Sequence, residues 1–270
     1  MPRLKDITHV GRRFDPGQFS NRFGLLASIG AAGLVFALDT GDLRRAFSTG
    51  LATFAAWAIA RELDPDHPLS GTVAALLVPI AVLTLGTPAP APLFVTMLTI
   101  RIVVRTTGLA PKATDLAVLT IGAIAIADTP AGWAASVLLA FAMVRDAALP
   151  GEPPPNAGLW GAALAIGVTM RVALAESLGA WHVPTVGSLA AFAVGLAGAV
   201  VVLRATPVLS LGDFTKTPLE PARVREGALF GILTGIVAFV AAGNPGIIAV
   251  SPLFGCFAAV AAVRILADGR

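Results

Sequence analysis

Apolar and polar positions alternate in long blocks along this chain, and not from one residue to the next. Ten apolar stretches follow residue 22, each bounded by charged residues or by Pro and Gly turns: 23–38, 46–60, 72–86, 93–104, 116–127, 132–144, 158–175, 186–203, 227–242 and 247–263. Several are shorter than the roughly 20 residues of a typical spanning helix. Flanking Arg and Lys side chains lengthen such spans because their stems reach back to the membrane surface. The pattern predicts an all-α, polytopic membrane protein with about ten transmembrane helices, arranged as hairpins.

The composition agrees with a membrane protein. Hydrophobic residues make up 56% of the chain and charged residues 13%, and the mean hydropathy is +0.82. A soluble domain is about 45–50% apolar and about 25% charged, so this chain has too few polar side chains to cover a water-facing surface. That excludes a soluble globular domain, a disordered chain and a nucleic-acid-binding domain. The expected partners are membrane lipids and a small-molecule substrate, with no nucleic acid.

The basic residues predict the orientation. With the N-terminus in the cytoplasm and ten spans, sixteen of the nineteen Lys and Arg residues fall on the cytoplasmic side, and only Arg44, Arg45 and Arg171 fall on the other. This asymmetry follows the positive-inside rule and favours an even number of spans. We therefore expect a multi-pass protein of the cell (inner or plasma) membrane with both termini in the cytoplasm. Residues 1–22 form a basic cytoplasmic segment and 23–270 a single transmembrane domain, with its longest cytoplasmic loop at 204–226.

An arginine ends every second apolar stretch. The five are Arg61, Arg105, Arg145, Arg204 and Arg264. They could form a ring of guanidinium groups that binds phosphates or anionic head groups. The simpler interpretation is that each complements a helix C-terminus on the positive-inside face.

A first acidic cluster lies between the second and third apolar stretches. Glu62, Asp64 and Asp66 fall within five residues, next to His67. Closely spaced carboxylates are ligands for Mg²⁺, and Mg²⁺ can hold a diphosphate. The alternative is a solvated helix end in which the aspartates are turn residues.

Two further polar clusters are expected on the same face. One contains Arg101, Arg105 and Lys112, and Arg101 lies about one turn inside its apolar stretch, where a charge must snorkel or find a partner. The other is the 210–220 loop with Asp213 and Lys216, which is placed to cover a cytoplasmic entrance. Together with Arg61, these basic residues are the candidates for binding a substrate or its phosphate.

Two of these strings are similar to known motifs. Residues 62–71 (ELDPDHPLSG) and the string around Gly212 and Asp213 resemble the Asp-rich motifs at two cytoplasmic helix ends of the UbiA-type intramembrane prenyltransferases. The resemblance departs from that family where Ala60 and Arg61 replace the usual asparagine-aspartate start. It implies an Mg-dependent enzyme that acts on a lipid phosphate or diphosphate. Under it, Glu62, Asp64, Asp66 and Asp213 would hold the metal.

Three functions fit the sequence. The leading one is a carrier or permease for a small organic or lipid-like solute, which requires a cavity that reaches the membrane midplane. The Mg-dependent enzyme is the alternative, and it requires the clusters at 61–68, 101–115 and 213–220 to meet in one cavity. The third is a non-catalytic subunit of a membrane complex, for which helix faces rich in small residues suit a partner membrane subunit or a homo-oligomer. A tightly packed bundle with a flat apolar flank would favour it.

Overall fold

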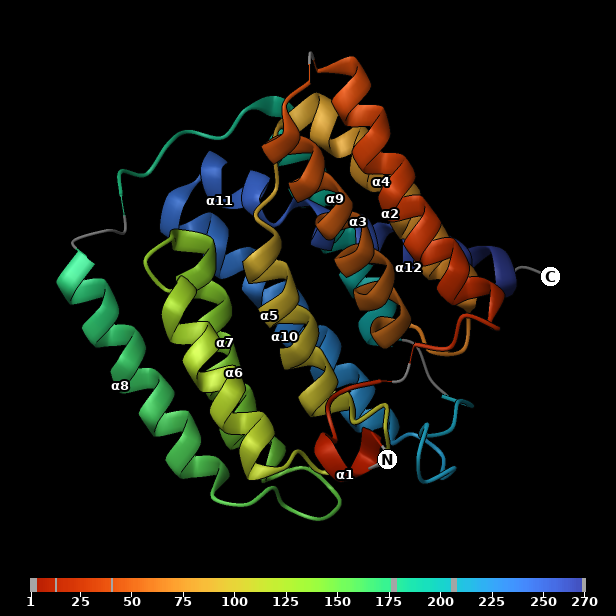
Figure 1. Ribbon diagram of the computed structural model, residues 1–270, viewed down its shortest axis with the longest axis vertical. Coiled ribbons are helices and arrows are strands. Elements are labelled where there is room, and N and C mark those ends of the chain that lie inside the picture. Colours follow the sequence, from red (N-terminus) through yellow and green to blue (C-terminus); the bar gives the residue numbers. More distant parts are fainter. Residues whose placement is uncertain (1–3, 13, 40, 176–178, 205–207, 269–270) are drawn as a thin grey trace.

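The regular elements of the protein are helices wherever the structure describes the chain. The computed structural model describes residues 4–12, 14–39, 41–175, 179–204 and 208–268 (Figure 1). The helices are α1 (Leu4–Ile7), α2 (Phe19–Leu38), α3 (Leu43–Leu63), α4 (Pro68–Leu85), α5 (Pro90–Val104), α6 (Ala113–Ile126), α7 (Pro130–Asp146), α8 (Ala157–Ala175), α9 (Val186–Arg204), α10 (Pro221–Ala242), α11 (Asn244–Ala249) and α12 (Ser251–Asp268).

All ten predicted apolar stretches lie on helices. The first nine fall on α2 to α10, while the last begins in α11 and continues in α12 after a break at Val250. Five helices, α2, α4, α8, α9 and α10, are long and apolar enough to cross a membrane, and α5, α6 and most of α12 are apolar over shorter lengths. The prediction of a helical membrane protein is therefore confirmed at this level. The number of spans and the side on which the termini lie stay predictions.

One end of the bundle collects the basic residues. Consecutive long helices run in opposite directions, so α3 and α5 end beside the starts of α4 and α6 (Figure 1). The end of α7 contacts the start of α10 through the pair of Asp146 and Arg223. We call this end, marked by Arg61, Arg105, Arg145 and Arg264, the basic end. Three of the sixteen residues assigned to the cytoplasm, Arg3, Arg13 and Arg270, lie outside the described residues.

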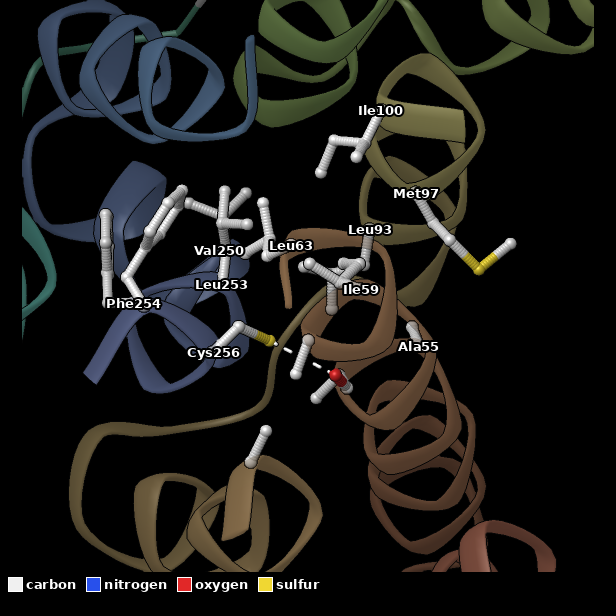
Figure 2. Packing of buried hydrophobic residues seen from close by; sticks show 14 of the residues in the cluster. Ala55, Ile59, Leu63, Leu93, Met97, Ile100, Val250, Leu253, Phe254 and Cys256 are labelled. Carbon is white, nitrogen blue, oxygen red and sulfur yellow. Dashed lines mark hydrogen bonds between the residues drawn. The ribbon is translucent and has the colours of Figure 1, made fainter. Parts of the chain in front are cut away.

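The largest apolar core lies between α3, α4, α5, α10 and α12. Figure 2 shows Ile59 and Leu63 of α3 facing Leu93 of α5 and Leu253 of α12, all four fully buried. The Cys256 thiol donates a hydrogen bond of 3.3 Å to the Ala56 carbonyl, which ties α12 to α3. This core holds α3 rigidly against its neighbours and thereby fixes the position of the side chains at its end.

Small residues allow some of these helices to approach closely. A Cβ atom added at Gly198 of α9 would lie 2.5 Å from the carbonyl oxygen of Phe257 on α12, closer than real Cβ atoms come. The two backbones are therefore in contact at this crossing, as is common where membrane helices pack through small residues.

Candidate functional site

A cavity of about 610 Å³ opens at the basic end. Its walls come from the N-terminal segment, the start of α2, α3, α5 and the loop between α9 and α10. These segments are far apart in sequence and meet only in the folded protein. Ligand cavities of proteins typically have volumes of about 300–1,000 Å³, so the cavity is large enough for an organic molecule.

Arg12 connects two walls of the cavity. Its Nε and Nη2 donate to Asp213 Oδ2 and Oδ1 at 2.6 and 3.1 Å, and its Nη1 donates to Glu62 Oε1 at 3.3 Å. Burial alone would lower the pKa of Arg12, but the carboxylates of Glu62 and Asp213 raise it above its ordinary value. The guanidinium therefore stays charged and fastens the N-terminal segment and the Asp213 loop onto α3.

Glu62 is the buried acid at the centre of the site. Its side chain is 0% exposed, and its Oε1 accepts from Arg101 Nε at 2.9 Å, with Arg101 Nη2 at 2.8 Å. Arg101 thus has the partner that its depth requires. The second oxygen, Oε2, accepts no hydrogen bond. The buried Thr106 hydroxyl lies beside Glu62 and likewise has no hydrogen-bond partner among the described residues.

Two cations in the cavity wall form no ion pair with a carboxylate in the part of the chain that the structure describes. Arg61 Nη1 donates to the Ser20 hydroxyl at 2.6 Å, and its guanidinium carbon lies 5.8 Å from the centre of the Trp57 ring. Its Nε is buried without an acceptor. Lys216 lines the same cavity from the loop. With four cations and three carboxylates in the wall, the cavity carries a net charge of +1 when all are ionised.

The inner part of the cavity is apolar. Phe54 and Trp57 of α3, with ring centres 5.4 Å apart, and Met97 of α5 line it. Phe54 and Met97 lie near the middle of their helices, and eight residues separate Phe54 from Glu62, about 12 Å of helix. Figure 2 shows the Met97 side chain extending away from Leu93 and Ile100, at the border of the core. The cavity is therefore charged at its mouth and apolar inside.

A smaller cavity of about 150 Å³ adjoins the first. Arg12, Arg61 and Asp213 line both, and Thr106 and Ser210 line only the smaller one. The Arg12–Asp213 pair therefore lies between the two spaces.

Arg105, a predicted phosphate-binding residue, lies outside the cavity. Its Nε and Nη2 donate to the two oxygens of Asp146 at 3.1 and 2.9 Å, and its Nη1 donates to the Glu152 carbonyl at 2.7 Å. Arg223 Nη1 also donates to Asp146. All three side chains are buried. This buried triad joins α5, α7 and α10 and leaves no group of Arg105 directed at a ligand.

The other predicted candidates are engaged elsewhere. Asp64 is buried between Arg264, His67 and Ser70, with Arg264 Nη2 at 3.1 Å. Asp66 accepts from the backbone N–H groups of Leu209 and Ser210 and from the Ser210 hydroxyl.

Burial alone would raise the pKa of Asp66, but these hydrogen bonds lower it below its ordinary value. The Asp66 carboxylate thereby holds Leu209 and Ser210 of the loop between α9 and α10.

Lys112 is also engaged away from the cavity. Its Nζ donates to the Asp6 carbonyl at 2.6 Å, which holds the N-terminal segment.

The predicted sites are thus only partly brought together. The structure gathers Arg61, Arg101, Lys216, Glu62 and Asp213 in one cavity. It places Arg105, Lys112, Asp64 and Asp66 in other contacts. Across the part of the chain that the structure describes, no group of three or more His, Cys, Asp or Glu side chains is arranged to hold a metal ion.

Four of the five helix-end arginines do not form the ring of guanidinium groups that the sequence suggested. Arg61 pairs with Ser20, Arg105 with Asp146, Arg145 with Glu226 and Arg264 with Asp64. Each contact joins a different set of elements, so these four arginines serve separate purposes.

The sequence alone did not reveal Arg12, Phe54, Trp57 or Met97 as parts of the site. Arg12 counted only as one of many basic residues that orient the chain. The other three lie in apolar stretches that predict nothing beyond packing. A tryptophan one turn before an arginine at a helix end, as with Trp57 and Arg61, is the one local signal that could have pointed to the cavity.

Comparison with known proteins adds no relative to this picture. No protein-family model, no curated protein and no solved structure matches the chain, so its similarity to the prenyltransferase motifs stays a local one.

Proposed function

We propose that this protein is a membrane carrier for an amphipathic anion, a molecule with a phosphate-like or carboxylate head group and an apolar tail. The observation that supports it most is the two-part cavity. Arg61 and Lys216 at its mouth match an anionic head group, while Phe54 and Met97 match an apolar tail. Because the apolar part reaches the middle of α3 and α5, a molecule bound there lies well inside the bundle.

The orientation follows from the distribution of charge. By the positive-inside rule the basic end faces the cytoplasm, so the cavity opens on the cytoplasmic side of the cell membrane. Arg12 and Asp213 come from segments outside the long helices. They form the part of the wall that does not belong to the packed helices, and a carrier that alternates its access would open the cavity there.

An enzyme that acts on a lipid phosphate is the second candidate. Its support is that parts of the three predicted clusters do meet, through Glu62, Arg101 and Asp213. The Mg-dependent form is less favoured, because Asp64 and Asp66 are engaged away from the cavity, and both remaining carboxylates already pair with Arg12.

Binding of 1-octanesulfonate to the protein in lipid nanodiscs tests the head-group chemistry. We expect saturable binding by calorimetry, and no binding of uncharged octyl glucoside. Arg61→Gln should weaken binding about tenfold or more, because a hydrogen bond to a charged group contributes about 1.5–3 kcal/mol. The matched control is Arg145→Gln, an exposed arginine of the same end that pairs with Glu226. It should bind like the wild type.

Uptake of radiolabelled octanesulfonate into proteoliposomes then separates carrier from enzyme. We expect saturable uptake that Arg61→Gln reduces and Arg145→Gln does not. Absence of octanesulfonate binding would refute the proposal. Binding without uptake would refute the carrier and leave the enzyme.

A further inference from the structure

Two guanidinium groups of the cavity, those of Arg12 and Arg101, are already neutralised by the protein's own carboxylates. Arg101 is 11% exposed and pairs with Glu62, and Arg12 pairs with both Glu62 and Asp213. An anion that enters from the mouth first meets Arg61 and Lys216. To bind more deeply, it has to compete with Glu62 for Arg101 and Arg12.

Such competition has different consequences for the two carboxylates. Asp213 is 35% exposed, so water can solvate it when Arg12 turns to the ligand. Glu62 is 0% exposed and already has one oxygen without a hydrogen bond. If a ligand takes its arginines, Glu62 becomes an isolated buried charge. A buried carboxyl group in that position takes up a proton in preference to remaining ionised.

Among the described residues, no cation besides Arg12 and Arg101 forms an ion pair with Glu62 that would replace the lost pairing. On α3 itself, Arg61 interacts with Glu62 without a hydrogen bond and directs Nη1 to Ser20. At the α4 and α12 contacts, His67 and Arg264 pair with Asp64. Arg223 of α10 pairs with Asp146, and in the N-terminal segment His9 Nδ1 lies 2.6 Å from the Ala110 carbonyl. Asp15 and Lys216 line the outer cavity.

We propose that each anion bound in this cavity is accompanied by one proton, which Glu62 takes up. The step is a simple protonation: a proton from water converts the Glu62 carboxylate to the carboxylic acid as the anion replaces it beside Arg101. Binding of the two is then reciprocal, since each raises the affinity for the other. This inference rests on the proposed function and specifies it as the co-transport of an anion with a proton.

Calorimetry of octanesulfonate binding in buffers of different ionisation enthalpy counts the protons taken up. This probe is suited to the test because a sulfonate stays anionic between pH 5.5 and pH 8. For the wild type we expect uptake approaching one proton per anion, and an affinity that falls up to tenfold per pH unit as the pH rises. In Glu62→Gln we expect binding without proton uptake and without pH dependence.

Asp213→Asn is the matched variant, since it removes the other carboxylate that pairs with Arg12. It should retain the proton uptake. Wild-type binding without proton uptake would overturn the inference and leave the proposed function intact. Proton uptake that persists in Glu62→Gln, or that is lost in Asp213→Asn, would overturn the assignment of the proton to Glu62. If the wild type does not bind octanesulfonate at all, the proposed function itself fails. Should Glu62→Gln not fold, the wild type and Asp213→Asn decide the question.

Discussion

Replacing Asp146 by alanine should destabilise the protein more than any change at the exposed surface of the basic end. Asp146 is fully buried and its carboxylate accepts three hydrogen bonds from Arg105 and Arg223. A hydrogen bond to a charged group contributes about 1.5–3 kcal/mol, so the sum over the three bonds is an upper bound on the stability lost when Asp146 is removed. Both arginines keep bonds to backbone carbonyls, including those of Glu152 and Pro150. We therefore expect a loss of about 3–5 kcal/mol, the usual cost of breaking a buried ion pair.

Reversible unfolding in mixed micelles of a mild detergent and dodecyl sulfate measures this free energy. Arg145→Gln provides the comparison, because it breaks the neighbouring Arg145–Glu226 pair, in which Arg145 is 46% exposed. Exposed pairs contribute about 0–1 kcal/mol. A loss for Asp146→Ala that is no larger than the loss for Arg145→Gln would refute the view that the triad holds α5, α7 and α10 together.

Two further predictions concern the walls of the cavity. Gly24→Val should displace Trp57, whose ring atoms lie 2.6 Å from a Cβ added at Gly24. We expect a cost of about 1–3 kcal/mol and weaker octanesulfonate binding by calorimetry, while Gly30→Val on the same helix, with open space around it, should change neither. The hydrogen bonds of Asp66 lower its pKa. Its hydrogen bond to the Leu209 amide should therefore be fully formed above the ordinary pKa of an aspartate, and it should weaken as the pH falls through the lowered pKa. Asp66→Asn should mimic this loss at pH 7, seen as faster hydrogen exchange at Leu209; unchanged exchange would contradict it.

The sequence predicted the helices well, because each apolar stretch is a local property of the chain. The blocks bounded by Arg61, Arg105 and Arg145 all became helices that end within two residues of these arginines. What each arginine contacts could not be predicted, since the partner lies on another element. Arg145 and Asp146 are adjacent in sequence, yet one pairs with Glu226 and the other with Arg105 and Arg223.

In the candidate site, too, the residues could be identified from the sequence but their contacts could not. Glu62, Asp64 and Asp66 look equivalent in the sequence, but the helix turn at the end of α3 sends them in different directions. Glu62 faces α5 and Arg101, whereas Asp64 caps the helix and faces Arg264 of α12. The spacing suggested a metal cluster, and the tertiary structure distributes its members over separate contacts.

The buried triad also sets an order for the assembly of the protein during synthesis. Arg105 and Asp146 lie on helices that the ribosome produces well before Arg223. Until α10 is made, Asp146 has one guanidinium partner, and the Arg12 partner Asp213 does not yet exist. A chain interrupted after α9 would therefore lack the Arg12–Asp213 pair and the part of the cavity wall that Asp213, Phe214 and Lys216 supply.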